Sequence, residues 1–430
     1  MNALQKLPCL ILLCGTLTAV AQIKDSFPAP NATKSSMNFC KVIGWGKAGK
    51  MPIAPAGFVV SRYADGFQNP RWMYVTPNGD VLVAEGNSNF TFIEKAGAVV
   101  TGANRAEDLS RSADRIMLLR DSNKDGIVDE KFTLLTRDNE LKQPFGMLII
   151  GDWLYVANTN AVLRFSYKAG QTKITDPGQK IIDLPAGKSF LDNRHWTRNL
   201  ISNTDNSKIY IAVGSSSNIA EKGIDEEILR ADILEINPDG SGMKVYASGL
   251  RNPVGMDWGP GTSTLWTSVN ERDELGDNLV PDYLTGVKPG GFYGWPYAYW
   301  GQHIDPRVKE QQNDLVKKTI VPDVDLGSHT ASLGLKFYNG KTFPAKYHGG
   351  AFIAQHGSWN KSVLAGYKIV FVPFSSGKPS GKPRDFLTGF IADLEQAKVY
   401  GRPVGLAVTQ DGALLVTDDA SNVIWRVSAK

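Results

Sequence analysis

Residues 402–417 read RPVGLAVTQDGALLVT, and the order of residue types in this stretch is repeated along the chain. A polar residue and a proline precede a short apolar run, which ends at an Asp-Gly turn and is followed by a second apolar run. Apolar runs rich in Leu, Val and Ala on both sides of such a turn are typical of a β-hairpin. The stretch therefore predicts two neighbouring antiparallel strands, with Arg402 just before the first.

The same pattern, with variations, begins at six places along the chain. The copies start with Asn69, Gln143, His195, Arg251, Ser332 and Arg402. The second apolar run leads on to another one, as at residues 161–165 and 423–427. Six copies of a four-strand unit predict an all-β fold, a six-bladed β-propeller of four-stranded blades with long inserted loops. The alternative, a pair of β-sandwiches, would not explain why the polar-Pro-x-Gly pattern recurs.

The composition is that of an ordinary soluble globular protein. Of the 430 residues, 42% are hydrophobic and 21% charged. The 43 glycines and 23 prolines favour many short strands joined by turns. The formal net charge is only +4 and no block of Lys and Arg stands out, so we do not expect a nucleic acid as partner.

Residues 1–21 have the features of a secretory signal peptide. Lys6 precedes an apolar run at 7–17, and Ala19-Val20-Ala21 supplies a small-x-small cleavage pattern. The run is shorter than the roughly 20 apolar residues that a membrane span requires, and no later stretch reaches that length. We therefore expect an exported chain, periplasmic or secreted, without a membrane span.

The rest of the chain is predicted to consist of an irregular N-terminal segment, residues 22–56, and a single propeller domain, residues 57–430. Cys9 and Cys14 lie in the predicted signal peptide, which leaves Cys40 as the one remaining cysteine. An internal disulfide is therefore not expected, and Cys40 is expected to be buried as a small hydrophobic residue.

Polar residues precede several of the predicted first strands. In a propeller each first strand lies innermost, so Gln143, His195, Arg251, Asn252 and Arg402 should meet at the central channel. Such a group is positively charged and rich in hydrogen-bonding groups, which suits a polycarboxylate or phosphate ligand. His195 is the member that can exchange protons near neutral pH. The alternative is a polar channel that holds only water, with His195 as an ordinary histidine in a turn.

Residues 121–129 read DSNKDGIVD and have the spacing of a calcium-binding loop. Side-chain oxygens of Asp121, Asn123, Asp125 and Asp129 occupy positions 1, 3, 5 and 9, with glycine at position 6. The flanking apolar runs predict a hairpin rather than the two helices of an EF-hand. Closely spaced aspartates repel one another without a cation, so we expect a structural Ca²⁺ here. The alternative is a polar Asp-Gly turn.

A third polar stretch, residues 270–278 (NERDELGDN), is followed by the glycine-rich aromatic stretch 289–296 (PGGFYGWP). The acidic residues could hold a second cation, and the aromatic turn could form a floor for a flat ring. A solvated surface loop is the alternative.

Five short motifs together resemble one known family. They are His195-x-x-x-Asn199-Leu200, GLRNP at 249–253, GGFYGWP at 290–296, HGSWN at 356–360 and GRPV at 401–404. In this order they are similar to the soluble glucose/sorbosone dehydrogenases that depend on pyrroloquinoline quinone (PQQ), and most similar to the sorbosone dehydrogenase branch. The resemblance extends over residues 57–427.

The resemblance implies a six-bladed propeller with PQQ across the top of the channel. His195 matches the catalytic base, and Arg251 with Asn252 matches the pair that contacts the quinone. Gln143 matches a cofactor-binding glutamine, and Arg402 matches an arginine that binds a carboxylate of the cofactor.

The resemblance also implies a catalytic Ca²⁺ near the backbone carbonyls around Arg272 and Asp273. Three positions depart from the glucose enzymes of the family. His356, expected among the cofactor-binding residues, stands where those enzymes have lysine, and Val404 stands where they have a second arginine. Arg194 precedes the base where they have an acid, so glucose is not assumed as the substrate.

The predicted activity is oxidation of an aldose or a sorbosone-like sugar aldehyde. His195 takes the hydroxyl proton, hydride passes to PQQ, and Ca²⁺ with Arg251 stabilises the developing negative charge. An external electron acceptor would reoxidise the cofactor. The alternatives are a non-catalytic exported propeller that binds a glycan or protein, and a hydrolase with a channel metal. The hydrolase would need several acidic residues ahead of the first strands, which the repeats do not provide.

Overall fold

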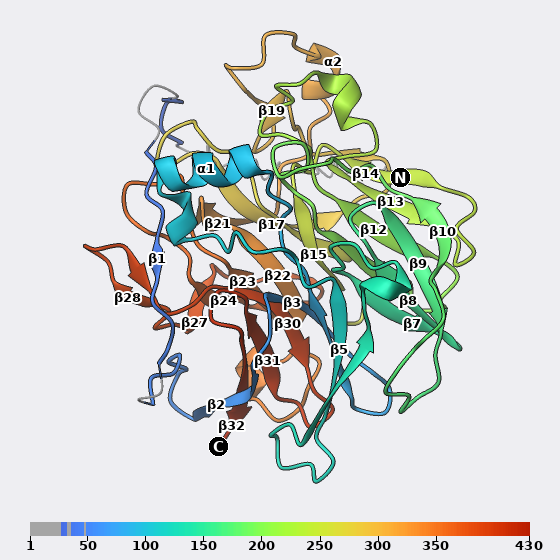
Figure 1. The fold of residues 1–430 in the computed structure, drawn as a ribbon. Coiled ribbons are helices and arrows are strands. Elements are labelled where there is room, and N and C mark those ends of the chain that lie inside the picture. Colours follow the sequence, from blue (N-terminus) through green and yellow to red (C-terminus); the bar gives the residue numbers. More distant parts are fainter. Residues whose placement is uncertain (1–26, 32–35, 47–48) are drawn as a thin grey trace, which may run out of the picture.

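The computed structural model describes residues 27–31, 36–46 and 49–430 of the chain (Figure 1). The described part is nearly all-β, as expected, with a few short helices. The predicted signal peptide lies outside the described residues. None of the described helices has the length and apolar character needed to cross a membrane. Cys40 is fully buried, as predicted, and is a free thiol in the described part of the chain.

Most strands of the described part belong to six sheets, each with an antiparallel core of four strands, which follow one another along the chain in all but the sixth. The first contains β3 (Pro70–Val75), β4 (Val81–Glu85), β5 (Arg115–Arg120) and β6 (Glu130–Leu135). The second contains β7 (Met147–Ile150), β8 (Trp153–Ala157), β9 (Ala161–Ser166) and β10 (Gln179–Asp183). The third contains β11 (Arg198–Ser202), β12 (Ile209–Val213), β13 (Asp232–Ile236) and β14 (Lys244–Ser248), extended by the parallel strand β18 (Gly291–Phe292).

The other three sheets follow the same plan. The fourth contains β15 (Pro253–Trp258), β16 (Leu265–Val269), β17 (Pro281–Val287) and β21 (Val324–Ser328). The fifth contains β22 (Ser332–Phe337), β23 (Ala351–Gln355), β24 (Lys368–Val372) and β27 (Arg384–Leu387). The sixth contains β30 (Pro403–Val408), β31 (Leu414–Asp418), β32 (Val423–Ala429) and β2 (Phe58–Asp65).

The remaining elements are short. The small strands are β1 (Lys41–Val42), β19 (Ala298–Tyr299), β20 (His303–Ile304), β25 (Phe374–Ser375), β26 (Lys378–Pro379), β28 (Ile391–Asp393) and β29 (Lys398–Val399). The α-helices are α1 (Phe92–Thr101) and α2 (Asn313–Val316). The described ranges also contain four 3₁₀ turns: η2 (Ala103–Arg105), η3 (Arg137–Asn139), η4 (Ile224–Glu227) and η5 (Ala345–Tyr347).

The first strands of the six sheets form a closed ring. Strand β3 contacts β7, and the contacts continue through β11, β15, β22 and β30 back to β3. The sixth sheet is completed by β2, which comes from the start of the described region and pairs antiparallel with β32. Each first strand is the inner edge of its own sheet, and in the closed ring these short edges lie against the neighbouring first strands.

All six strand pairs predicted from the repeats are present and antiparallel. The Asp411-Gly412 turn illustrates the local reason. Gly412 adopts a φ of 83°, which favours glycine, and its N–H donates to Thr409 O at 2.9 Å. Thr409 N in turn donates to Ala413 O at 2.9 Å, which starts the pairing of β30 with β31.

The glycine of the repeat is required by the close approach of neighbouring first strands. Four such glycines lie in, or directly before, a first strand and touch the next one: Gly146, Gly255, Gly334 and Gly405. A Cβ atom at Gly334 would lie only 2.2 Å from Val404 O, and one at Gly146 only 2.5 Å from Leu200 N. These are backbone atoms of strands held in sheets, so they cannot move aside cheaply. The recurring glycine therefore fixes the spacing of the ring.

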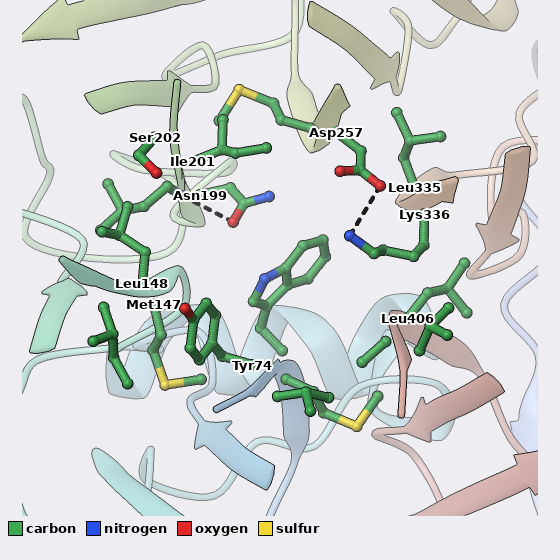
Figure 2. Close-up of a pocket in the computed structure, with 18 of the residues that line it drawn as sticks. Tyr74, Met147, Leu148, Asn199, Ile201, Ser202, Asp257, Leu335, Lys336 and Leu406 are labelled. Atoms are coloured by element: carbon green, nitrogen blue, oxygen red, sulfur yellow. Dashed lines mark hydrogen bonds and ion pairs between the residues drawn. The ribbon is translucent and has the colours of Figure 1, made fainter. Parts of the chain in front are cut away.

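Apolar side chains fill the middle of the ring. Trp72, Val254, Leu333 and Val404 come from four different first strands and pack in one buried cluster. Beyond them, the C-terminal halves of the first strands line a cavity of about 270 Å³. Figure 2 shows the Lys336–Asp257 ion pair, 3.0 Å long, in its wall. The two ends of the ring are therefore separated by an apolar layer.

The N-terminal segment, predicted to be irregular, packs against the sixth sheet. Its short strand β1 pairs parallel with β29. Trp45 packs on Trp425 with 5.1 Å between ring centroids, and its indole N–H donates to Asp418 Oδ2 at 2.6 Å. These contacts anchor the segment to the sheet that β2 completes.

We predict that Gly334→Ala lowers the free energy of unfolding by about 2 kcal/mol or more, because the new methyl group overlaps the Val404 carbonyl. Gly97→Ala is the matched control, since a Cβ atom there meets nothing within 4 Å and alanine favours the helix. Urea unfolding monitored by tryptophan fluorescence measures both. Equal stabilities of the two variants would contradict the close contact as the source of the glycine requirement.

Candidate active site

The residues singled out from the sequence lie at one end of the ring. The C-terminal halves of all six first strands line one cavity, so the beginnings of these strands share the opposite end. Second strands are antiparallel to first strands, and the residues after them return to that end. Loops that precede a first strand or follow a second strand therefore converge, as predicted for Gln143, His195, Arg251 and Arg402.

His195 is held in its neutral form. Its Nδ1 lies 2.9 Å from Ser215 O and 3.0 Å from Ser215 Oγ. A carbonyl oxygen can only accept, so Nδ1 carries the proton and Nε2 keeps its lone pair. Nε2 has no hydrogen-bond partner in the part of the chain that the structure describes. Burial, and next the positive charge of Arg251, lower the pKa of His195 well below 6.5.

Asn252 lies beside His195, across Gly214. A Cβ atom at Gly214 would lie 2.3 Å from Asn252 Oδ1 and 2.5 Å from His195 Cβ, so only glycine leaves room for both side chains. Asn252 Oδ1 is buried and finds no donor among the described residues. A buried acceptor without a partner is unfavourable, so this atom favours a donor supplied by a ligand or water. Two neighbouring side chains, His195 and Asn252, thus each carry an acceptor without a partner among the described residues.

Arg251 is fully engaged with the protein, and only 2% of it is exposed. Its donors reach Asn218 O (3.3 Å), Asn218 Oδ1 (2.9 Å), Asn270 O (3.2 Å), Glu271 O (2.5 Å) and Asp273 Oδ2 (3.1 Å). The guanidinium therefore fills a pocket of backbone carbonyls. A ligand oxygen could bind Arg251 only by sharing or replacing one of these acceptors.

The carbonyl predicted near a catalytic cation is also engaged. Asp273 O accepts from Arg272 Nη1 at 2.6 Å and from Asn218 Nδ2 at 3.1 Å. Arg272 itself is buried and pairs with Asp305 at 2.7 Å. Across the described ranges, no three His, Cys, Asp or Glu side chains form a group that could hold a metal ion. A Ca²⁺ at Arg272 and Asp273 stays a prediction.

Asp273 joins Arg251 to a second histidine. Its Oδ1 lies 3.2 Å from His329 Nδ1, while His329 Nε2 lies 2.9 Å from Gly276 O. Both partners of His329 are acceptors, so both ring nitrogens donate and the imidazole is protonated. Burial opposes this state, but the hydrogen bond to Asp273 raises the pKa of His329. Asp273 thus lies between two cations, Arg251 and the protonated His329. Burial raises the pKa of Asp273, but the hydrogen bond from His329 and the two positive charges outweigh it, so the pKa is lowered.

Arg402 and His356 form a second group. His356 Nε2 donates to Asp419 Oδ1 at 2.9 Å, and Arg71 forms an ion pair with the same carboxylate. Burial, with help from the charge of Arg402, lowers the pKa of His356 to about 4, so the ring is neutral. Arg402 Nε donates to His356 O at 3.3 Å. His356, predicted to bind the cofactor, is thus occupied by a carboxylate of the chain.

Gln143 belongs to a third group. Its Nε2 donates to Asn87 O at 2.8 Å, its Oε1 accepts from Asn89 at 3.2 Å, and its backbone N–H donates to Asp114 at 2.8 Å. The structure therefore brings the predicted residues to one end of the ring but divides them among three hydrogen-bonded groups.

The polar stretch at 270–278 is not a solvated surface throughout. Glu271 and Arg272 are buried, and burial raises the pKa of Glu271 to about 7. The aromatic stretch at 289–296 supports the site from behind, because Trp295 Nε1 donates to Asn218 O at 2.8 Å. Asn218 in turn fixes Arg251, so this aromatic turn acts on the site through Asn218.

Several residues of the site were not identified from the sequence: Arg71, Ser215, Asn218, His329 and Asp419. Two of them had a usable signal. Ser215 follows β12 and Asp419 follows β31, so both come just after a second strand and return to the same end as the first-strand loops. The repeat itself therefore indicates these positions, although it does not indicate their partners.

The predicted calcium loop, residues 121–129, lies at the tip of the hairpin between β5 and β6. Its carboxylates accept hydrogen bonds from the backbone of the same loop, such as Asp121 Oδ2 from Gly126 N at 2.8 Å and Asp129 Oδ2 from Ser122 N at 2.7 Å. The hairpin is confirmed, and the bound cation stays a prediction.

Residues 52–283 and 299–430 match the TrAA12-like family. An uncharacterized protein of Borreliella burgdorferi is 34% identical over 248 residues, which cover 57% of this chain and 62% of that protein. The pyrroloquinoline quinone-dependent pyranose dehydrogenase of Coprinopsis cinerea is 30% identical over 214 residues, which cover 46% of this chain and 26% of that enzyme. The chain thus spans less than two thirds of the length of these relatives.

Solved structures share the fold at lower identity. An iodide structure of the Trichoderma reesei enzyme of family AA12 has a TM-score of 0.70 and 20% identity, covering 91% of this chain and all of that one. A calcium structure of the same enzyme has a TM-score of 0.69 and 19% identity, and the match covers 91% of this chain and 99% of that one. The holo PQQ domain of the Coprinopsis cinerea pyranose dehydrogenase has a TM-score of 0.69 and 19% identity, and the match covers 91% of this chain and 100% of that one.

We predict that His195 stays neutral, with its proton on Nδ1, at pH values well below 6.5. Nitrogen-15 NMR of the imidazole distinguishes the two tautomers and follows the titration. Arg194→Gln should raise the pKa of His195, because it removes one of the positive charges that lower it. A proton on Nε2, or a titration midpoint at or above 6.5, would contradict the assignment of Nε2 as the free base.

Proposed function

We propose that this chain, which belongs to the TrAA12-like family, is an exported dehydrogenase that oxidises an aldose or a sugar aldehyde with PQQ as cofactor. Relatives with a named activity, such as the pyranose dehydrogenase of Coprinopsis cinerea, are PQQ-dependent sugar oxidoreductases. The observation that carries the proposal is the neutral His195, whose Nε2 has no partner among the described residues and whose neighbour Asn252 has an unpaired Oδ1.

The same proposal covers the architecture and the location. The ring of first strands, and the completion of the last sheet by β2, support a six-bladed β-propeller in which the six sheets are the blades. The signal-like residues 1–21 support export to the periplasm or the medium. A sorbosone-like aldehyde is the favoured substrate within the sugar class, with an external electron acceptor.

The residues at this end of the ring fit an anionic quinone. Arg402 and Arg251 would pair with its carboxylates or oxygens, and Gln143 and Asn252 would hydrogen-bond to it. The unpaired Asn252 Oδ1 has no donor among the described residues, which supports a ligand at this position. When bound, PQQ supplies a two-electron acceptor for the hydride of the sugar.

His195 performs the proton step in this proposal. Nε2 accepts the hydroxyl proton of the sugar, and the Nδ1–H bond to Ser215 O keeps the ring oriented while it becomes positively charged. Asp273, which lies near His195 and holds Arg251, partly offsets this new charge. Asn252 Oδ1 accepts from a neighbouring sugar hydroxyl, which orients the reacting carbon.

The direct test is reconstitution of the purified chain with PQQ and CaCl₂, followed by a screen of aldoses and sugar aldehydes with a dye as electron acceptor. We expect dye reduction that depends on PQQ and that EDTA reduces. PQQ binding without dye reduction by any of these substrates would favour the alternative, a non-catalytic propeller that binds a glycan or protein.

In the reconstituted enzyme, His195→Gln should lower kcat by about 10²- to 10⁴-fold, because the proton acceptor is lost. The affinity for PQQ, measured by quenching of tryptophan fluorescence, should change little. His303→Gln, at an exposed histidine of β20, is the matched control and should keep full activity. Turnover of the His195 variant at the normal rate would remove His195 as the base.

We also propose a structural Ca²⁺ in the 121–129 hairpin, where the carboxylates exchange their backbone partners for the cation. Saturating Ca²⁺ at 100 times its Kd should stabilise the chain by about 2.7 kcal/mol, measured as a rise in Tm. Asp121→Asn with Asp129→Asn should lose most of this rise. If the double variant responds to Ca²⁺ as the native chain does, the cation binds elsewhere.

A further inference from the structure

Residues 86–114, here called the strap, connect β4 to β5 and carry helix α1. In Figure 1, α1 lies outside the sheets, at their edge. Figure 2 looks into the cavity at the other end of the ring, and the pale blue helix α1 crosses behind it. The strap therefore lies across the end of the ring that holds the candidate active site.

The strap binds both outlying residues of the proposed cofactor site. Near its start, Asn89 Nδ2 donates to Gln143 Oε1 at 3.2 Å. Beyond α1, Arg402 Nη1 donates to Glu107 Oε1 at 3.1 Å and to Ala106 O at 3.2 Å. Glu107 thus presents to Arg402 the same chemical group, a carboxylate, that an anionic cofactor would present. Gln143 and Arg402 cannot give these contacts to a ligand while the strap holds them.

Between these two points the strap contacts the loop that leads to His195. Glu94 Oε1 accepts from Leu191 N at 2.7 Å. Phe90 packs on Phe190, with 4.9 Å between ring centroids. The strap therefore runs from Gln143, over the loop that leads to His195, to Arg402. It contacts Gln143 and Arg402 directly, and it contacts the His195 group through residues 190–191.

Helix α1 is held by polar contacts rather than by a core. None of its residues is buried, and Phe92, Ile93 and Val100 are 86%, 81% and 88% exposed. The partly buried side includes Glu94. The apolar side thus faces outward, opposite to an ordinary surface helix. Lifting the strap breaks a few hydrogen bonds and one ion pair, in which Glu107 is 41% exposed. It also separates Phe90 from Phe190 and Ala106 from the core cluster it packs against, and these are the apolar contacts that must be given up.

The base of the strap is tied together independently of these contacts. Asn87 Nδ2 donates to Asp108 O at 2.7 Å, and Asn87 N donates to Ser112 Oγ at 3.0 Å. Gly86 is packed so tightly that a Cβ atom there would lie 2.9 Å from Pro144 O. Residues 88–107 can therefore move as a flap while the two ends stay joined.

We propose that residues 88–107 are a gate, latched by the Glu107–Arg402 ion pair, which must open before an anionic cofactor can reach Arg402 and Gln143. This inference rests on the proposed function, because the ligand is PQQ. When the cofactor enters, one of its carboxylates replaces the Glu107 carboxylate on Arg402, and the Glu107 side chain moves into water. The latch therefore sets the rate at which the cofactor associates.

The test compares PQQ association with the full chain and its variants by stopped-flow quenching of tryptophan fluorescence at saturating Ca²⁺. Glu107→Gln should raise the association rate constant tenfold or more, because the latch loses its charge. Glu107→Asp keeps the negative charge but shortens the side chain, and it should raise the rate as well. Glu226→Gln removes an exposed acidic charge away from these contacts and should leave the rate unchanged.

The outcomes separate the gate from the proposed function. If the native chain and the Glu107 variants bind PQQ at the same rate, the gate is wrong and the proposed function stands. If only Glu107→Gln is faster, the effect is simple charge repulsion and the latch is wrong. If no variant binds PQQ, the proposed function fails and the gate fails with it. Hydrogen exchange of residues 88–107 without ligand should also rise in both Glu107 variants, and unchanged exchange would overturn the latch.

Discussion

Backbone contact between neighbouring first strands is the constraint on which the rest of the structure depends. The glycines at 146, 255, 334 and 405 let one strand approach the next so closely that a single methyl group would overlap the backbone. This spacing closes six sheets into a ring, and the antiparallel turn within each sheet returns the chain to the end where it began. Functional side chains that are far apart in the sequence are therefore brought together by the fold itself. Each has only to lie just before a first strand or just after a second one.

Electrostatics decides which of these side chains can act. His195 feels opposing influences, because burial and Arg251 disfavour its charged form while Asp273 favours it. The effects of burial and Arg251 are larger, so the ring is neutral and Nε2 keeps a free lone pair. At His329 the balance is reversed, because the direct hydrogen bond to Asp273 outweighs burial and the imidazole is protonated. Two histidines near one carboxylate thus differ in charge because only one of them touches it.

The repeats predicted the six strand pairs and the end of the ring where polar residues meet, because both follow from local periodicity and turn chemistry. The partners of these residues were not predictable in the same way. The pairing of Asp419 with His356, and that of Asn218 with Arg251, depend on how loops from different sheets pack, which leaves no periodic trace in the sequence. The contribution of β2 to the last sheet was likewise missed, since strand order at the point of closure depends on the whole ring.

The acidic residues of the site follow one pattern. Arg71, Arg251 and Arg402 each meet a carboxylate of the chain itself, at Asp419, Asp273 and Glu107. A buried guanidinium without a counter-ion would be strongly unfavourable, so a chain that binds an anion through arginine must neutralise that arginine while the anion is absent. The side chains of Asp419 and Asp273 are only 8% and 15% exposed and are engaged by histidines, whereas that of Glu107 is 41% exposed and follows a helix without buried residues. Exchange with an external carboxylate is therefore easiest at Arg402, because Glu107 recovers its hydration as soon as it leaves.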